Sequence, residues 1–263
     1  NIMIEYEETE KAFKNYLTNY NLADGGIKLK VVHTYKVVEK SEYIAKSLGL
    51  DEENITLAKV IGLLHDIGRF EQVKKNNDFS DNTGFNHADY GVKVLFKDNM
   101  IRKFVTDQKY DKIIEKAIYN HNKYKIEEGL NEIELLHSKM IRDADKLDNF
   151  RVKEKEDFKN MFLNQYNAET INYEEVSTKV YNDFMQHKCI KLMDRKTQID
   201  YWVCVIAFIF DFYFTVSLEY IKENEYIDKL VDRIQYKNKT TKNQMENIRK
   251  CAKEYINNKV NER

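Results

Sequence analysis

Proline is absent from all 263 residues of this chain. Proline makes up about 5% of an average protein, so roughly a dozen would be usual at this length. Because proline breaks helices and marks turns and strand edges, its absence favours helices joined by short polar loops. Only 8 glycines occur, and the alternating runs bounded by turn residues that indicate strands are hard to find. The sequence therefore predicts an all-α fold.

Apolar residues at helical spacing extend over most of the chain. Gly49 is expected to end the first strongly periodic helix, and Asp51 to cap the start of the next. The polar stretch 69–85 is expected to be a loop. The expected helices are 27–48, 51–67, one starting near 86, 109–123, 131–144, 150–165, 173–192, 200–223, 226–238 and one starting near 241.

The most apolar segment is YWVCVIAFIFDFYFTVSL, at residues 201–218. A membrane-spanning helix needs about 20 apolar residues. Asp211 would cost roughly 2.5–3.5 kcal/mol at the centre of a bilayer. A helix that is apolar on all sides is also typical of a domain core. We therefore expect a central core helix here and no association with a membrane.

Charge and cysteine usage constrain partners and location. The 43 basic and 44 acidic residues leave a net charge of −1, so no overall field favours long nucleic acid as a partner. Cys189, Cys204 and Cys251 form no CxxC motif, which favours reduced thiols in a cytoplasmic protein. No secretory signal is recognised. Nothing in the sequence indicates an oligomeric state.

The stretch LAKVIGLLHDIGRFE, residues 57–71, looks like an apolar helix until His65 and Asp66 occur side by side. Buried polar side chains cost free energy unless a partner satisfies them. More histidines and another acid fall on the inward faces or ends of other expected helices. The full set is His33, His65, Asp66, His87, His121 and Asp145.

Each of these residues alone has an ordinary explanation, as a hydrogen-bonded core histidine or a helix cap. Together they point to metal binding, because buried charges need pairing or a metal, and imidazole with carboxylate suits first-row divalent ions. We expect two ions, from among Fe, Mn, Ni, Co and Zn, with Mg as a further candidate. A carboxylate can bridge two ions, so the expected arrangement has Asp66 between one ion held by His33, His65 and Asp145 and another held by His87 and His121.

In this order the residues resemble the HD superfamily of metal-dependent phosphohydrolases. The matching features are His33, the motif HDIG at 65–68, and Asp145 within ADKLD. His87 and His121 fit the two intervening histidines of members with binuclear centres. The resemblance covers roughly residues 28–150. It implies a helical HD-domain bundle with additional C-terminal helices: a metal-binding core at 1–155 and a helical extension at 156–263, packed on the core as one compact unit.

The chain also departs from parts of this superfamily. The HD-GYP phosphodiesterases carry a Gly-Tyr-Pro signature, which a chain without proline lacks. Some cyclic-dinucleotide enzymes have paired histidines where this chain has His121 followed by Asn122. A third metal ion is therefore in doubt.

The resemblance implies hydrolysis of a phosphomonoester or phosphodiester, in a nucleotide or another small molecule, by metal-activated water. Arg69 is expected either to clamp a phosphate or to cap a helix end, and Lys146 either to contact phosphate or to face solvent. Asp148 is expected to orient a metal ligand, and His137 to be a core residue. Two other functions stay open: a mixed-valent di-iron oxygenase, which uses the same ligand types, and a non-catalytic nucleotide sensor.

Overall fold

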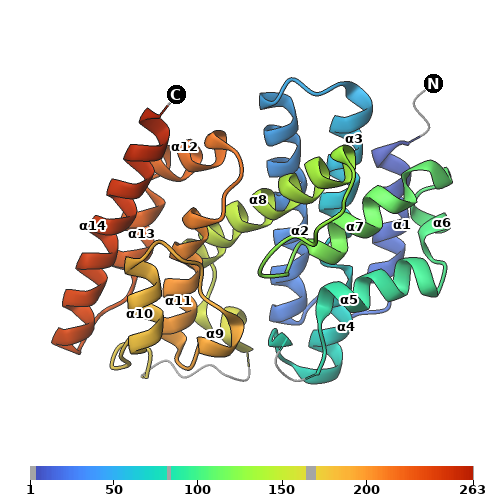
Figure 1. The fold of residues 1–263 in the computed structure, drawn as a ribbon. Coiled ribbons are helices and arrows are strands. Elements are labelled where there is room, and N and C mark those ends of the chain that lie inside the picture. The colour runs from blue at the N-terminus through green and yellow to red at the C-terminus, as the bar shows by residue number, and fades with distance from the viewer. Residues whose placement is uncertain (1–3, 82–83, 164–169, 263) are drawn as a thin grey trace. The chain divides into compact units, whose positions relative to one another are not determined.

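Every regular element in the part of the chain that the structure describes is a helix (Figure 1). The structure is a computed structural model and describes residues 4–81, 84–163 and 170–262. The predicted class, an all-α bundle with additional C-terminal helices, is confirmed. The chain divides into two compact units, Asn1–Asp148 and Asn149–Arg263. This boundary lies a short distance before residue 155, where the sequence analysis places it.

Helix α3 is central to the first unit, since it contacts α1, α2 and α7. Helix α4 contacts α2 and α5, and α5 in turn contacts α7. A π-helical turn, Lys93–Lys97, continues α5. The helices of this unit are α1 (Tyr6–Leu17), α2 (Gly25–Ser47), α3 (Glu52–Leu64), α4 (Ile67–Asn76), α5 (His87–Val92), α6 (Ile101–Phe104), α7 (Asp111–Asn120) and most of α8 (Glu132–Lys155).

Local sequence sets the ends of α2 and α3. Asp24 accepts hydrogen bonds from two backbone N–H groups in the first turn of α2. Asp51 does the same for the N–H of Asn54 in α3, which confirms the predicted cap. Gly49 follows α2 with a φ of +69°, a left-handed conformation that glycine adopts without strain. Because each of these two helices has a capped N-terminus, α2 and α3 form a stable support for the side chains that they carry.

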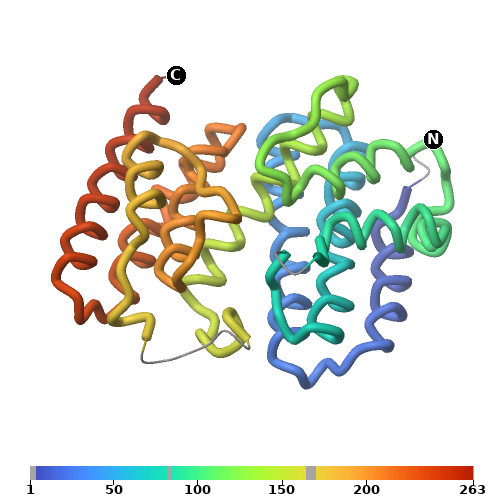
Figure 2. The backbone as a smooth tube through the Cα atoms, turned by 60° about the horizontal axis from the view of Figure 1, so that its bottom comes forward, coloured from blue at the N-terminus to red at the C-terminus, as the bar shows by residue number. Residues whose placement is uncertain are grey.

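The second unit packs around α11 and α14. Trp202 in α11 is fully buried, and its indole Nε1 donates to the backbone oxygen of Leu230, 2.7 Å away in α13. Helix α14 lies against α10, α12 and α13 (Figure 1 and Figure 2). The helices of this unit are the end of α8, α9 (Phe158–Phe162), α10 (Thr178–Met185), α11 (Gln198–Ile206), α12 (Thr215–Glu223), α13 (Tyr226–Arg233) and α14 (Lys239–Asn261).

The sequence predicts two helices, at 131–144 and 150–165. The structure has one helix here, α8, which runs without a break to Lys155. The expected interruption at 145–149 does not occur. Asp145 and Asp148 instead hydrogen-bond His33, at 2.9 and 2.6 Å, so tertiary contacts satisfy these carboxylates within a continuous helix. Residues 164–165 lie outside the described residues.

Two more expectations about local structure are wrong. The expected loop 69–85 begins as helix, because Phe70 and Val73 of α4 are buried in the core and hold it in place; residues 82–83 lie outside the described part. The apolar segment 201–218 is buried along much of its length, as expected of a core element, but it is not one helix. Helix α11 ends at Ile206, a 3₁₀ turn follows, and α12 starts at Thr215.

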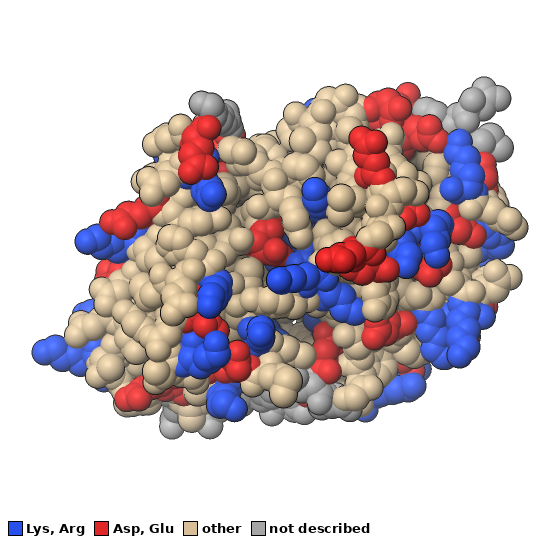
Figure 3. All heavy atoms as spheres, in the orientation of Figure 1, with Lys and Arg blue, Asp and Glu red and all other residues tan. Residues whose placement is uncertain are grey.

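Within residues 4–81, 84–163 and 170–262, no helix is long and apolar enough to cross a bilayer. Figure 3 shows basic and acidic side chains interspersed over the face in view. The three cysteines carry free thiols, as predicted.

Gly68 lies where α4 and α5 approach most closely. A Cβ atom at this position would overlap the backbone oxygen of His87 and lie 3.0 Å from the backbone nitrogen of Gly91. Because both obstacles are backbone atoms, no side-chain rotation relieves the overlap. The neighbour that requires glycine at position 68 is therefore the start of α5.

Replacing Gly68 with alanine should push α5 away and destabilise the protein by about 2–3 kcal/mol, the usual size of an overpacking penalty. Urea unfolding followed by circular dichroism measures the change. Gly91→Ala is the matched control, because the atom nearest to its added Cβ would be a side-chain methyl of Ile67, at 3.2 Å, and the nearest backbone atom, Gly68 N, would lie at an ordinary contact distance of 3.6 Å. Equal stability losses in the two variants would contradict the assignment.

Candidate metal centre

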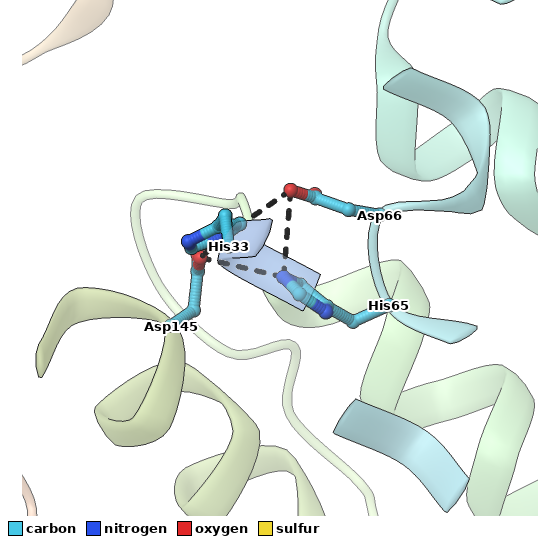
Figure 4. A group of neighbouring side chains, drawn as sticks. All are labelled: His33, His65, Asp66 and Asp145. Atoms are coloured by element: carbon cyan, nitrogen blue, oxygen red, sulfur yellow. Dashed lines mark hydrogen bonds and ion pairs between the residues drawn. The ribbon is translucent and has the colours of Figure 1, made fainter. Parts of the chain in front are cut away.

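The six predicted residues lie together in the first unit and form two groups that share Asp66. His33, His65, Asp66 and Asp145 form the first group (Figure 4). The second group consists of Asp66, His87 and His121. Within each group the potential ligand atoms all lie within 4.8 Å of one another.

The elements of the first unit bring these side chains to one place. His33 lies inside α2, and Asp145 lies inside α8. His65 follows the last residue of α3, and Asp66 directly precedes α4, so the doublet forms the corner between two helices. Asp66 has φ −106° and ψ 19°, near the sparsely populated bridge region of backbone conformation. His87 is the first residue of α5, and His121 directly follows α7.

The first group is compact and buried. His33 Nε2 lies 2.9 Å from Asp145 Oδ1 and 3.4 Å from Asp66 Oδ2. His65 Nε2 lies 3.4 Å from the same oxygen of Asp145 and 3.5 Å from the same oxygen of Asp66. Figure 4 shows all four side chains directed toward a common point. Two imidazole nitrogens and two carboxylate oxygens thus face each other across a space of the size a metal ion needs.

The second group uses the other oxygen of Asp66. Its Oδ1 lies 3.2 Å from His87 Nε2 and 3.3 Å from His121 Nε2. The two Nε2 atoms are 3.0 Å apart. Since Oδ2 faces the first group and Oδ1 the second, Asp66 is placed as a carboxylate bridge between two ions would be.

Each of the four imidazoles has its Nδ1 atom engaged by an oxygen. The acceptors are a carboxylate for His33 and His87 and a backbone carbonyl for His65 and His121, so Nδ1 carries the hydrogen in every ring. This leaves Nε2, the atom that faces the cluster, as the potential ligand. The four contacts are His33 to Asp148 (2.6 Å), His65 to the Gly62 carbonyl (2.6 Å), His87 to Asp81 (2.9 Å) and His121 to the Ile118 carbonyl (2.6 Å).

This donor set fits divalent metal ions. His65 Nε2 is buried and has no hydrogen-bond partner among the described residues. Burial lowers the pKa of His121 to about 4, so its ring is neutral at pH 7 and its Nε2 lone pair faces Nε2 of His87, 3.0 Å away. Lone pairs that converge with carboxylate oxygens repel one another, and a cation between them removes the repulsion. Imidazole with carboxylate suits Zn, Mn, Fe, Co or Ni.

His33 differs from the other three histidines. Burial and the neighbouring Lys30 lower its pKa, but hydrogen bonds to Asp145, Asp148 and Asp66 outweigh them and raise the pKa to about 10. Without metal, His33 therefore carries a proton on Nε2 at neutral pH. That proton must leave before Nε2 can bind an ion.

Two cations lie close to the cluster. Lys30 is buried one turn before His33, and its Nζ lies 3.4 Å from Asp66 Oδ2. Arg69 lies in the first turn of α4, so it does not cap a C-terminal helix end. Its Nη1 donates to Gln72 Oε1 and to the carbonyl of Phe79, each at 2.6 Å. Lys146 is buried in α8 beside Asp145 and does not face solvent freely.

Sequence reasoning missed three residues near the site: Lys30, Asp81 and Arg142. Arg142 is buried, and its guanidinium donates to carbonyls of residues 120, 123 and 124, which fixes the turn that carries His121. Charged residues of this kind resemble surface residues in a sequence. For Lys30, a weak signal existed in its position three residues before His33, on the same helix face.

Asn122 does not act as a second histidine would. Its amide nitrogen donates to Asn86 Oδ1 at 3.0 Å and to Asp81 Oδ2 at 3.3 Å. The residue thus belongs to the hydrogen-bond network behind His87.

Metal binding at the first group should release about one proton near pH 7.5, because an ion must displace the His33 proton. The affinity for Mn²⁺ should therefore rise with pH up to about 10, the pKa of His33. Calorimetric titration in two buffers of different ionisation enthalpy counts the protons released. Asp148→Asn, which weakens support for the imidazolium, should release fewer protons. Binding without proton release would contradict this account of His33.

His137 lies on α8 away from both ligand groups. Its Nε2 donates to Asn54 Oδ1 at 2.9 Å, and its Nδ1 is buried with no partner among the described residues. Burial lowers its pKa to about 4, despite the nearby charge of Asp51. The structure thus agrees with a neutral core histidine.

The unfolded chain binds a proton at His137 near pH 6.5, whereas the folded protein resists protonation until about pH 4. Stability from this site should be complete above pH 6.5 and should fall as the pH drops toward 4, by roughly 3 kcal/mol in total. Urea unfolding of the wild type and of His137→Gln between pH 7 and pH 4.5 isolates the effect. The variant should show a flatter pH dependence, and parallel curves would exclude His137 as the cause.

Comparison with known proteins agrees with this geometry. Residues 31–149 match the family model described as HD domain, and the match spans all six residues of the two groups. No curated protein and no solved structure matches the chain. HD domains are generally found in metal-dependent phosphohydrolases. Residues 31–149 of this chain are therefore an HD domain.

Proposed function

We propose that this protein is a metal-dependent phosphohydrolase that cleaves a phosphomonoester or phosphodiester in a nucleotide or another small molecule. One observation carries the proposal: four imidazole Nε2 atoms and two carboxylates converge, with Asp66 directing one oxygen to each group. Two divalent ions held there supply Lewis acidity, which lowers the pKa of a water molecule and neutralises charge on a phosphoryl group.

The chain's own residues would then have three tasks. His33, His65 and Asp145 would hold the first ion, His87 and His121 would hold the second, and Asp66 would contribute an oxygen to each. Lys30 and Arg69 place positive charge beside the centre, where a phosphate would gain favourable electrostatic energy in a buried environment. Lys146 is assigned a phosphate contact because it neighbours Asp145 on α8. Water is the nucleophile, so no side chain forms a covalent intermediate.

The side chains of the site differ in exposure, and this difference supports an approach of substrate from the more exposed side. The side chain of Asp145 is 18% exposed, whereas those of His33, His65 and Asp66 are 3% exposed or less. The centre therefore reaches solvent on the Asp145 side. The balanced net charge of −1 favours a small phosphoester over a long nucleic acid.

Asp66→Ala should abolish binding of both ions and reduce phosphoester hydrolysis to background, because it removes the only carboxylate common to both groups. Metal analysis of protein purified without chelator, followed by a phosphoester panel with Mn²⁺, Co²⁺, Ni²⁺ and Mg²⁺, measures both effects. Asp89→Ala is the matched control: Asp89 is also an aspartate of the first unit, but its side chain is 54% exposed and pairs with Lys123. It should retain metal content and activity.

Other outcomes separate the competing functions. Two irons in the purified protein, together with substrate-dependent O₂ uptake, would indicate an oxygenase and not a hydrolase. Tight nucleotide binding without turnover across all the metals would indicate a sensor. Unchanged hydrolysis by a folded, metal-free Asp66→Ala variant would reject the proposed centre itself.

A further inference from the structure

We propose that Asp81 is the positioning residue of the second ion: it prepares His87 for metal and makes binding of that ion depend on the order of segment 77–81. The inference rests on the proposed metal centre and concerns how one half of it is assembled. It assigns a function to a carboxylate that is not itself among the potential ligands.

Asp81 receives hydrogen bonds from three separate parts of the first unit. Its two oxygens lie 3.1 and 2.9 Å from His87 Nδ1, and Oδ1 also accepts the backbone N–H of His87 at 3.0 Å. The side-chain amide of Gln72 donates to Oδ1 at 3.1 Å, and that of Asn122 donates to Oδ2 at 3.3 Å. The guanidinium of Arg69 lies 3.8 Å from Oδ1.

The contact between Asp81 and His87 Nδ1 determines which ring nitrogen of His87 can bind a metal ion. A carboxylate only accepts hydrogen bonds, so the hydrogen of the neutral ring stays on Nδ1 and the Nε2 lone pair points to Asp66 and His121. Free imidazole side chains in water favour the opposite tautomer, with the hydrogen on Nε2. Without Asp81, His87 would lose the arrangement that makes Nε2 a ligand.

The four histidines differ in what holds their Nδ1 atoms. His65 and His121 donate to carbonyls three residues earlier in the chain, at the ends of their own helices. His33 donates to Asp148, inside the long helix α8. His87 alone among them depends on a residue from a connecting segment. The second ion should therefore be the more sensitive of the two to local disorder.

Segment 77–81 also contacts the cations beside the centre. The carbonyl of Phe79 accepts from Arg69, and the carbonyl of Ser80 accepts from Gln72 at 3.1 Å. The Phe79 ring centroid lies 4.9 Å from Lys30 Nζ, and Lys30 pairs with Asp66. One segment thus supports both His87 and the cation next to the bridging carboxylate. Binding of the second ion and ordering of this segment must then favour each other, by linkage.

Removal of a hydrogen-bond partner behind a metal-binding histidine typically weakens metal affinity by about 10–100-fold. Asp81→Ala should show a loss of this size for the second ion only, while the first ion binds as in the wild type. Asp148→Ala should give the reciprocal result, because Asp148 supports His33 in the first group. Asp81→Asn keeps one oxygen acceptor and should recover part of the affinity.

The experiment titrates the metal-free full-length protein with Co²⁺ alone and follows the visible absorption spectrum and the heat of binding. Nitrogen-15 NMR of labelled histidine, assigned with a His87→Gln variant, reports the tautomer of His87 before metal is added. Hydrogen exchange at residues 78–81 reports the order of the segment. Asp89→Ala is the control, since it removes an exposed aspartate near His87 that does not contact its ring.

The expected result is two Co²⁺ sites in the wild type, selective weakening of one in Asp81→Ala, and a shift of the His87 hydrogen from Nδ1 to Nε2. Hydrogen exchange at 78–81 should slow in the wild type only when the second ion binds. Two unchanged sites with an unchanged tautomer in Asp81→Ala, or equal weakening of both sites, would overturn the assignment of Asp81 and leave the metal centre standing. A wild type that binds no Co²⁺ would reject the metal centre on which the inference rests.

Discussion

The arrangement of the first unit depends on the carboxylate of Asp66. One of its oxygens faces His33 and His65, and the other faces His87 and His121. Four helix ends or faces must approach within a few ångströms of this one group, which is why α4 and α5 meet at glycine and why a carboxylate or a backbone carbonyl lies behind each ring. The packing of the bundle is thus arranged around a polar centre that only a cation satisfies fully.

The grouping of the six candidate ligands could be predicted because they occur together as a set. A single histidine or aspartate, such as His33 or Asp145, could be a core residue or a cap, but the complete set needs pairing or a metal, and the doublet at 65–66 added a recognisable motif. Asp81 and Arg142 gave no such signal, because a charged residue in a polar stretch has the appearance of a surface residue. Their importance follows from contacts between segments distant in sequence, which composition and spacing do not encode.

Errors in the predicted helices have the same origin. No helix was expected over 145–149, yet Asp145 and Asp148 are paired with His33 and α8 continues. The residues after Gly68 looked like a loop, yet buried Phe70 and Gln72 hold α4 in place. Local propensity was overridden in each case by partners from other helices. By contrast, caps such as Asp51 depend on neighbouring residues only, and that prediction was confirmed.

The corner between α3 and α4 carries a consequence for stability. Adjacent residues of a continuous helix project about 100° apart, whereas at this corner His65 and Asp66 direct donors to the same point. A substitution that joined α3 to α4 would gain backbone hydrogen bonds and relieve the unusual conformation of Asp66, but it would separate the two donors. Selection for greater thermal stability at this position would therefore act against the candidate metal centre, a local trade-off between stability and the proposed function.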